Sequence, residues 1–330
     1  MREIHKVLAT VPYREDKRKI LEEAFAPADV CWVSKDDREK ISEVLKEADA
    51  AVLGSDITPQ ILKEGVHLKW IHCDHAGLNA SARPEVFERN IILSGSAGRS
   101  GPVLAEHIFF LTLSLIYDSH GLLKQQEQKV WGGIPDYQER RGLYGKTMGI
   151  IGMGYTGQET AKRAKAFGMT VLGYGRSKGE PFDFVDKMYY QSEGDGIKRL
   201  LTESDVVVLS IRLSDETYHM IDAEALKSMK PTAYLINMAR GAVIDEAALA
   251  EALKNKVIAG AGCDTFECEP LPAESPLWDL PNMVITPHCT PEMPDLAARS
   301  LEIICENVKR FREEKNLKNQ LSVRDVYTKN

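Results

Sequence analysis

Cysteine is scarce in this sequence and forms no recognisable pattern. Six cysteines are spread over 330 residues, and no two of them have the C-x-x-C spacing of zinc sites and redox motifs. Their spacing also excludes the dense disulfide framework of small secreted domains. The run His-Cys-Asp-His at 72–75 contains metal-ligand types without zinc spacing, so we predict reduced thiols and no metal site.

Long apolar segments and an export signal are also lacking. The longest strongly apolar segment, 108–117, is far shorter than the roughly twenty residues that span a bilayer. The opening residues, MREIHKVLAT, are charged and lack the apolar core of a signal peptide. We therefore expect a soluble, cytoplasmic protein with no membrane partner.

The chain has no excess of positive charge. Lys and Arg number 42 against 49 Asp and Glu, which leaves a net charge of −7 with no obvious basic cluster to offset it. Nucleic acid is therefore not expected as a partner. Hydrophobic residues make up 43% and charged residues 28%, which are values of an ordinary globular protein. At this length the chain can form two domains, each with its own core.

Short apolar runs alternate with polar helical stretches through the first hundred residues. The predicted strands cover 7–9, 30–33, 50–53, 68–72 and 91–93, and the predicted helices cover 15–25, 37–47 and 84–88. Such alternation is typical of a parallel sheet with helices on both faces. We therefore predict an α/β protein whose first domain is a flavodoxin-like, doubly wound sheet.

The rest of the chain continues this alternation after a break at Gly101 and Pro102. A long apolar helix is predicted from Val103 to about Lys124, followed by an irregular stretch over 125–145. The later predicted strands cover 148–151, 170–174, 206–211, 233–236, 258–263 and 283–285, and the later helices cover 158–167, 196–202, 222–229, 246–254 and 296–313. The tail from Lys315 is polar, and we expect it to be partly ordered at best.

A glycine motif lies at the start of this second set of strands. Gly152, Gly154 and Gly157 have the spacing G-x-G-x-x-G, directly after an apolar strand and directly before a helix. The three glycines allow a tight turn, close approach of the backbone to a pyrophosphate, and close packing of the helix on the strand. The N-terminus of the helix would then bind the phosphates. We predict a second doubly wound sheet, a Rossmann domain that binds a dinucleotide.

The end of the following strand indicates which dinucleotide is bound. An acidic residue there usually binds the ribose of NAD, whereas an arginine accommodates the 2′-phosphate of NADP. This chain has Gly175, Arg176 and Ser177 at that position. We therefore predict NADP(H) as the preferred cofactor, with NAD(H) as the alternative. The competing interpretation is that Arg176 is a solvated loop residue.

Three polar residues follow predicted strands on the side where ligands bind in such sheets. Arg240, Glu269 and His288 have the chemistry needed to reduce a 2-oxo acid. A guanidinium binds a carboxylate, a histidine donates a proton near neutral pH, and a carboxylate stabilises the charged imidazole. Taken singly, each has an ordinary alternative, such as a salt bridge for Arg240 and a loop hydrogen bond for His288.

The segments around these residues resemble those of the D-isomer-specific 2-hydroxyacid dehydrogenases. The resemblance rests on Leu104-Ala105-Glu106-His107, GKTMGIIGMGYTG, NMARGAVIDE, CDTFECEPLP and ITPHCTPE, and it covers essentially the whole chain. It implies a substrate domain formed by residues 1–100 and 289–330, an inserted nucleotide-binding domain over 101–288, and a homodimer. It also implies that Arg240, Glu269 and His288 are the catalytic residues.

The predicted ligand contacts combine this resemblance with the rule that ligands bind beyond the carboxyl ends of parallel strands. The predicted substrate contacts are Ser55, His75, Ala76, Gly77, Arg240 and His288. The predicted cofactor contacts are Gly152, Gly154, Tyr155, Thr156, Gly157, Gly175, Arg176, Ser177, Arg212, Met238, Ala239 and Asp264. By the resemblance, the N–H groups of Ala76 and Gly77 would bind the substrate carboxylate, and Asp264 would contact the nicotinamide carboxamide.

Two of these positions depart from the family pattern. His75 stands where a glycine is usual, which could narrow the substrate loop or add a polar contact. Arg212 stands where a proline is usual, and it is either a second cation for the 2′-phosphate or adenine, or an exposed side chain.

The resemblance implies an NADPH-preferring reduction of a 2-oxo acid to a D-2-hydroxy acid. The Gly175-Arg176-Ser177 segment resembles the glyoxylate/hydroxypyruvate reductases of the family, which makes these two acids the first expected substrates. Bulkier acids such as phenylpyruvate are the alternative. Formate dehydrogenases carry glutamine at the position of Glu269, and phosphoglycerate dehydrogenases often carry extra domains. A dinucleotide-sensing binding protein is a further alternative, because the transcriptional corepressors of this fold retain the same three residues.

Overall fold

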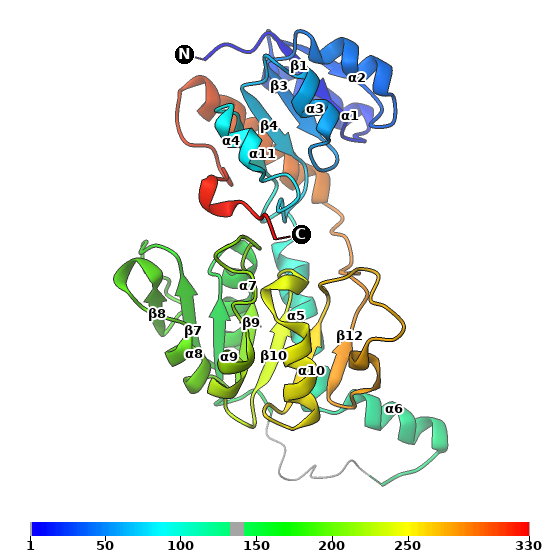
Figure 1. Cartoon of the computed structure of the whole chain (residues 1–330), viewed down its shortest axis with the longest axis vertical. Coiled ribbons are helices and arrows are strands. Elements are labelled where there is room, and N and C mark those ends of the chain that lie inside the picture. Colours follow the sequence, from blue (N-terminus) through cyan, green and yellow to red (C-terminus); the bar gives the residue numbers. More distant parts are fainter. Residues whose placement is uncertain (1, 133–141, 330) are drawn as a thin grey trace. The chain divides into compact units, whose positions relative to one another are not determined.

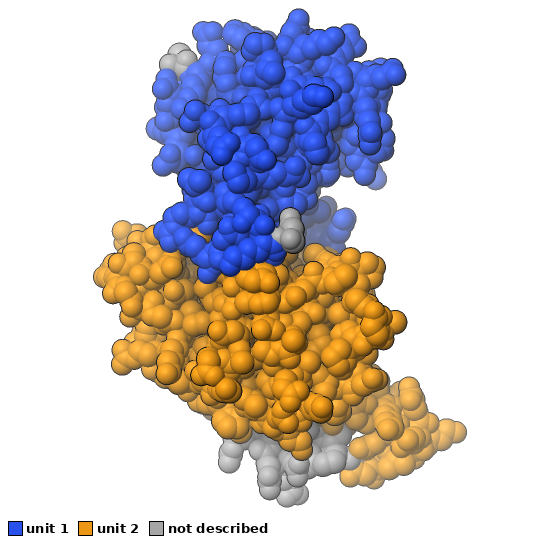
Figure 2. Space-filling view, in the orientation of Figure 1, with its two compact units in different colours: residues 1–100, 214–216, 292–330 blue, residues 101–213, 217–291 orange. Residues whose placement is uncertain are grey.

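Two parallel sheets organise the chain, one in each of two structural units (Figure 1, Figure 2). The computed structural model describes residues 2–132 and 142–329. Unit 1 comprises residues 1–100, 214–216 and 292–330, and unit 2 comprises residues 101–213 and 217–291. The predicted domain boundary near the end of the chain follows residue 288, whereas the division between the units follows residue 291.

The sheet of unit 1 has five parallel strands in the order β2-β1-β3-β4-β5. Its strands are β1 (Lys6–Ala9), β2 (Asp29–Trp32), β3 (Ala50–Leu53), β4 (Trp70–Cys73) and β5 (Ile92–Gly95). Its helices are α1 (Glu15–Phe25), α2 (Arg38–Leu45), α3 (Pro59–Glu64), α4 (Pro84–Glu88) and α11 (Leu296–Arg312). This is the flavodoxin-like strand order, so the predicted fold of this part of the chain is confirmed.

Helices cover both faces of this sheet because its strands are apolar on both sides. Strand β3, for example, reads Ala-Ala-Val-Leu and is buried throughout. Side chains from α2, α3 and α4 pack in the core on one face, and side chains from α1 and α11 pack in the core on the other. In the second core the rings of Phe25 and Phe311 both pack against Trp70, with centroid distances of 5.8 and 5.5 Å. The two ends of the chain therefore share one core.

A row of polar side chains crosses β4 and β5 inside unit 1. His72 is fully buried, and its two ring nitrogens each lie 3.0 Å from a hydroxyl, one of Ser94 and one of Ser96. Ser96 in turn donates to the carboxylate of Asp74 at 2.7 Å. Burial lowers the pKa of His72 to about 4, so the ring is uncharged at neutral pH. This row anchors the chain immediately before the predicted substrate loop that begins at His75.

Acid is expected to destabilise unit 1 through His72. Between about pH 6.5, the ordinary pKa of histidine, and about pH 4, the unfolded chain binds a proton that the folded chain does not. Stability therefore rises with pH across this window, and acidification from pH 7 to pH 4.5 removes about 2–3 kcal/mol. We expect His72→Gln to lose this component of the pH dependence of urea unfolding, and His67→Gln, at an exposed position, to retain it. Equal acid sensitivity of the wild type and His72→Gln would contradict the assignment.

The C-terminal tail is an ordered part of unit 1, so the prediction of a partly ordered tail was wrong. Leu321 is buried, and its N–H donates to the carbonyl of Leu93 at 2.8 Å. The side-chain amide of Asn319 donates to the carbonyls of Gly95 and Ala97. Tertiary hydrogen bonds thus order a stretch whose polar composition predicts little order.

The sheet of unit 2 has seven parallel strands in the order β12-β11-β10-β9-β6-β7-β8. Its strands are β6 (Thr147–Ile151), β7 (Thr170–Gly175), β8 (Lys187–Tyr190), β9 (Val206–Leu209), β10 (Tyr234–Asn237), β11 (Gly260–Cys263) and β12 (Met283–Ile285). Its helices are α5 (Gly101–Ile116), α6 (Ser119–Gln128), α7 (Tyr155–Ala166), α8 (Lys198–Glu203), α9 (Ala223–Ser228) and α10 (Glu246–Lys254). This is the Rossmann order with one added strand, which confirms the predicted fold, although the edge strand β8 was not predicted.

The apolar stretch after residue 100 forms two helices, which corrects the prediction of one helix over 103–124. Helix α5 already begins at Gly101 and packs against β10, β11 and α7. Asp118 then takes a left-handed conformation with a φ of 48°, and its carboxylate accepts from the Gly121 N–H to cap α6. Figure 1 shows α6 standing away from the sheet of its unit. The irregular stretch predicted over 125–145 lies partly outside the described residues.

Helix α5 is strongly apolar and 16 residues long. Neither it nor any other helix within residues 2–132 and 142–329 has the length and apolar character needed to cross a membrane.

Candidate active site

The glycine motif forms the turn between β6 and α7. Gly152 has a φ of +102°, and a Cβ there would lie 2.5 Å from the carbonyl oxygen of Ser210, so the position requires glycine. The Ser210 hydroxyl donates to the Gly152 carbonyl at 2.7 Å and holds the turn against the end of β9. At Gly157 a Cβ would clash with the same Gly152 carbonyl. Helix α7 therefore packs tightly against the end of β6.

Gly154 differs from these two glycines because its missing side chain leaves open space. Its φ is −73°, which any residue adopts, and no described heavy atom beyond its chain neighbours lies within 4 Å of a Cβ placed there. A ligand can therefore approach the backbone at the N-terminus of the 12-residue helix α7, where an anion is stabilised. These features fit the pyrophosphate of a dinucleotide.

The two glycines at 154 and 157 are expected to respond differently to alanine. Gly157→Ala forces a methyl group against the Gly152 carbonyl, and we expect Tm to fall by about 6–12 °C, as for an overpacked site. Gly154→Ala is expected to leave Tm unchanged but to weaken NADPH binding by about tenfold, because the methyl group fills the space of the pyrophosphate. Calorimetry and a fluorescence titration with NADPH measure the two effects. A Gly154→Ala protein that binds NADPH like the wild type would show that the phosphates lie elsewhere.

The end of β7 presents the residues that would select the cofactor. Arg176 is half-buried, and its carbonyl accepts from the Ser192 N–H at 3.0 Å. A little further on, Lys178 forms an exposed ion pair with Glu193 at 2.7 Å. Gly175, Arg176 and Ser177 include no carboxylate that would repel a phosphate.

The other predicted cofactor residues of unit 2 lie beyond the carboxyl ends of its central strands. Tyr155 and Thr156 form the first turn of α7, and Tyr155 is about half exposed. Arg212 follows β9 and is exposed, while Met238 and Ala239 follow β10 and are buried. The parallel order of the strands brings all of these positions to the edge that carries the glycine turn.

Arg240 lies in a loop directly after β10 whose shape depends on Asn237. The buried Asn237 side chain donates to the Arg240 carbonyl at 3.1 Å and accepts from the Ala239 N–H at 3.0 Å. The Arg240 guanidinium donates to the Ala239 carbonyl at 2.7 Å. At Gly241 a Cβ would clash with the backbone of residues 266–267. The Arg240 loop therefore packs directly against the loop that follows β11.

His288 and Glu269 form a hydrogen-bonded pair. His288 Nδ1 lies 2.8 Å from Glu269 Oε2, and the Phe266 N–H donates to Glu269 Oε1 at 2.9 Å. Because an ionised carboxylate can only accept, Nδ1 carries the proton of this bond. His288 has a φ of +50°, a left-handed conformation that costs about 1–2 kcal/mol in a non-glycine residue. Its side chain is 50% exposed, so a ligand can reach it.

Asp264 is buried directly after β11 and organises the chain around His288. The Thr286 hydroxyl donates to its carboxylate at 2.6 Å, and the Thr290 hydroxyl lies 3.3 Å from its other oxygen. The Cys289 N–H donates to the same carboxylate at 3.1 Å. Three polar contacts therefore tie the turn after β12 to the end of β11.

The predicted substrate residues of unit 1 lie beyond the carboxyl ends of β3 and β4. Ser55 comes after β3, and His75, Ala76 and Gly77 come after β4. His75 Nδ1 lies 3.1 Å from the Ala76 carbonyl oxygen, and Nε2 lies 3.7 Å from an Asp56 carboxylate oxygen. Gly77 has a φ of +76°, which favours glycine at this turn.

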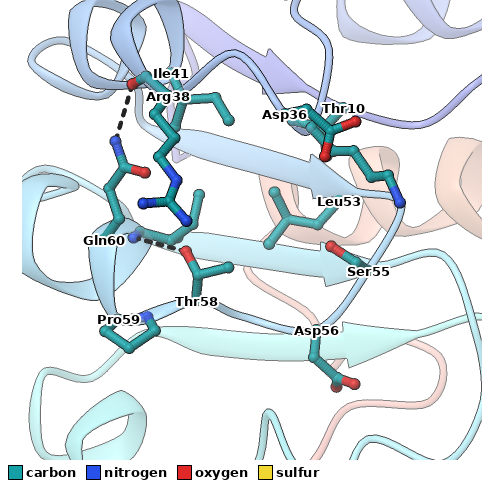
Figure 3. A pocket seen from close by; sticks show the side chains of 12 residues that line it. Thr10, Asp36, Arg38, Ile41, Leu53, Ser55, Asp56, Thr58, Pro59 and Gln60 are labelled. Atoms are coloured by element: carbon teal, nitrogen blue, oxygen red, sulfur yellow. Dashed lines mark hydrogen bonds between the residues drawn. The ribbon is translucent and has the colours of Figure 1, made fainter.

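A surface depression of about 520 Å³ adjoins Ser55 in unit 1 (Figure 3). In Figure 3, Ser55 and Asp56 border it from the end of β3, and Arg38 borders it from α2. The cations Lys35 and Arg38 are balanced by the carboxylates of Asp36 and Asp56. This mixed lining has no net preference for an anion.

A family model matches much of unit 2. Residues 109–290, more than half of the 330 residues, match the model described as the NAD binding domain of D-isomer specific 2-hydroxyacid dehydrogenase. The chain belongs to this family. The resemblance that its sequence motifs predict is therefore confirmed, and the protein is an NAD(P)-dependent D-2-hydroxyacid dehydrogenase.

Named relatives of this dehydrogenase match most of its length. The glyoxylate reductase of Korarchaeum cryptofilum is 34% identical over 82% of this chain and 82% of its own. The glyoxylate reductase of Pyrococcus furiosus is 34% identical over 93% of this chain and 92% of its own. Among solved structures, the D-isomer specific 2-hydroxyacid dehydrogenase of Xanthobacter autotrophicus Py2, in complex with NADPH and MES, is 25% identical. That match covers 98% of this chain and 99% of the other, with a TM-score of 0.80.

Four residues that hold the site of this dehydrogenase together have no predicted role. Ser210, Asn237 and Thr286 lie at or just beyond the ends of β9, β10 and β12. Their position at the carboxyl ends of predicted strands, where ligands bind, could have indicated a role in the site. His107, which contacts Thr286 and Thr290, lies inside the apolar helix α5 and was noted only as part of a family motif. Its helical surroundings predict a buried core residue.

Proposed function

We propose that this dehydrogenase reduces small 2-oxo acids to D-2-hydroxy acids, with NADPH preferred and with glyoxylate and hydroxypyruvate as its substrates. The observation that carries the proposal is the 2.8 Å pairing of His288 with Glu269, next to the packed loop of Arg240. Two further facts support it. The relatives from Korarchaeum cryptofilum and Pyrococcus furiosus are named glyoxylate reductases, and the Xanthobacter autotrophicus structure holds NADPH.

His288 supplies the proton in the proposed reaction. Its Nδ1 donates to Glu269, whose negative charge stabilises the imidazolium form. Its Nε2 then donates a proton to the substrate carbonyl oxygen as negative charge develops there. In the reverse direction the neutral ring accepts the hydroxyl proton at the same atom.

Arg240 binds the substrate and polarises its carbonyl in this proposal. Its guanidinium stays charged and offers a planar set of donors that matches a carboxylate. The bond from Arg240 to the Ala239 carbonyl restrains the guanidinium before a ligand arrives. In unit 1, the N–H groups of Ala76 and Gly77 would bind the substrate carboxylate, and Ser55 and His75 would border it.

The glycine turn, Arg176 and Asp264 would hold the cofactor. Gly154 leaves space for the pyrophosphate, and the Arg176 guanidinium matches a 2′-phosphate. Asp264 would accept a hydrogen bond from the nicotinamide carboxamide. When bound, the cofactor supplies the hydride that reduces the carbonyl carbon.

The test is the initial rate of cofactor oxidation with glyoxylate, hydroxypyruvate and phenylpyruvate, measured with NADPH and with NADH. We expect fast turnover of glyoxylate and hydroxypyruvate and a clear preference for NADPH. Chiral chromatography of the hydroxypyruvate product checks the D configuration. Faster turnover of phenylpyruvate would replace the substrate assignment, and a preference for NADH would overturn the cofactor assignment. No turnover of any of the three acids would refute the proposed substrate class.

We also propose that the dehydrogenase forms a homodimer through unit 2. Large apolar side chains are exposed on α5 and α6 and in the segments that follow them, and these include Phe110 (55% exposed), Leu123 (57%), Trp131 (104%) and Tyr144 (86%). Large apolar side chains left exposed in one stretch of the chain are candidates for a contact surface. Light scattering after gel filtration is expected to give twice the mass of one chain, and a monomer mass would contradict the proposal.

A further inference from the structure

A closed ring of polar contacts surrounds the turn that carries His288. His107 Nδ1 lies 2.7 Å from the Thr290 hydroxyl, and His107 Nε2 lies 3.1 Å from the Thr286 hydroxyl. Both hydroxyls also contact the Asp264 carboxylate, at 2.6 Å from Thr286 and 3.3 Å from Thr290. A single side chain of α5 thus reaches the turn on both sides of His288.

The two ionisable members of this ring are shielded from water. Asp264 is 2% exposed and His107 is 7% exposed. In such surroundings hydrogen bonds are strong, and a group that loses its partner pays a large desolvation penalty. Breaking the contacts of Asp264 or His107 is therefore costly.

The protons of the ring follow from the chemistry of its members. The Asp264 carboxylate can only accept, so the Thr286 hydroxyl donates its single proton to it. His107 Nε2 must then donate to the Thr286 oxygen. In a neutral His107, Nδ1 consequently accepts from Thr290, and this is the shorter of the two contacts made by the Thr290 hydroxyl. A neutral His107 with its proton on Nε2 therefore satisfies three of the four contacts, and the 3.3 Å contact between Thr290 and Asp264 carries no proton.

The backbone at the centre of this turn needs support. His288 has a φ of +50°, an uncommon conformation for a residue other than glycine. Its N–H donates to the Thr286 carbonyl at 3.0 Å, and the next N–H, of Cys289, donates to Asp264 at 3.1 Å. The position of the His288 ring therefore depends on the residues that hold the turn on either side.

We propose that His107 is a positioning residue for His288. Through Thr286 and Thr290 it holds the turn in the conformation that keeps His288 paired with Glu269. This inference rests on the proposed function, in which His288 is the proton donor. The same ring includes Asp264, so it also couples the position of the proton donor to that of a predicted cofactor contact.

The test opens the ring at Thr290. Thr290→Val keeps the shape of the side chain but removes the hydroxyl, so His107 Nδ1 loses its donor. The matched control is Thr112→Val. Thr112 is a buried threonine of α5, the helix that also carries His107, and its hydroxyl donates to the Ile108 carbonyl at 2.6 Å. A second pair consists of His107→Leu, which removes both contacts, and His107→Gln, which keeps an N–H donor for Thr286.

We expect Thr290→Val to lower kcat by about tenfold while the KM values for the oxo acid and for NADPH change by less than about threefold, because a misplaced catalytic group costs rate rather than binding. His107→Leu is expected to lower kcat by more than tenfold, and His107→Gln is expected to have a kcat between that of His107→Leu and that of the wild type. In protein labelled with ¹³C-histidine, the His288 ring signal is identified by its absence in His288→Gln. This signal is expected to shift and broaden in Thr290→Val and to stay unchanged in Thr112→Val.

Wild-type kcat with an unchanged His288 signal in Thr290→Val would overturn the proposal. A lower Tm with unchanged kcat and an unchanged signal would also overturn it, because that pattern marks a purely structural role. The NMR measurement requires no turnover. It therefore still decides the role of the ring if the wild-type enzyme reduces none of the oxo acids, and the two failures can be told apart.

Discussion

His288→Gln is expected to lower kcat for 2-oxo acid reduction by about a thousandfold, the range lost when a general acid is removed. Glutamine keeps a similar size and a donor for Glu269, but it has no proton to exchange near neutral pH. NADPH binding is expected to be unchanged, because the proposal assigns the imidazole to proton transfer. Steady-state kinetics with hydroxypyruvate and a fluorescence titration with NADPH measure the two quantities.

His219 provides a closely matched control for this experiment. Its Nε2 lies 2.8 Å from a carboxylate oxygen of Glu267, its φ is +49°, and it also belongs to unit 2. His219→Gln removes an imidazole from a second His–Glu pair with a similar backbone conformation, and we expect kcat to stay within about twofold of the wild type. Equal losses in the two variants would contradict the assignment of His288. A wild-type rate in His288→Gln would refute its role as the proton donor.

The second large effect is expected at the end of β7. Arg176→Ala is expected to weaken NADPH binding by about 10–100-fold, because a hydrogen bond to a charged group is worth about 1.5–3 kcal/mol. NADH binding is expected to change little, because NADH lacks the 2′-phosphate that the guanidinium matches. Dissociation constants for both cofactors, measured by fluorescence titration at one salt concentration, give the ratio.

Lys178 is the matched control for Arg176. It carries the same charge nearby in the chain, and its ammonium group forms an exposed ion pair with Glu193. Lys178→Ala is therefore expected to change the affinity for either cofactor by less than about threefold. If Arg176→Ala weakens the binding of both cofactors equally, Arg176 does not bind the 2′-phosphate. If Arg176→Ala weakens the binding of neither cofactor, Arg212 becomes the cation to test at this edge of the sheet.

Much of the fold follows from local sequence patterns. Strands β3 and β9 read AAVL and VVVL, and such short apolar runs between helical stretches indicate parallel strands buried on both faces. The glycine motif likewise predicts the turn after β6, because the φ of +102° at Gly152 is one that glycine readily adopts. These features depend on residues that are close together in the chain.

The predictions that failed have identifiable physical reasons. The apolar pattern of α5 conceals the break at Asp118, where a φ of 48° interrupts the predicted single helix and the carboxylate caps the start of α6. Strand β8 reads KMYY, is partly exposed, and pairs with β7 at the edge of the sheet, so it lacks the pattern of a buried strand. The tail was misjudged because its order depends on bonds such as that from Leu321 to Leu93, which no local pattern reveals.

The amino-acid sequence alone identified Arg240, Glu269 and His288 as residues with suitable chemistry. The tertiary structure decided which of these residues meet. The strand order β10-β11-β12 places Asp264 beside Thr286, and the packing of α5 brings His107 to Thr290, 183 positions away in the chain. Such contacts depend on strand order and helix packing, which are set by the burial of the whole apolar core and leave no signature in the residues nearby.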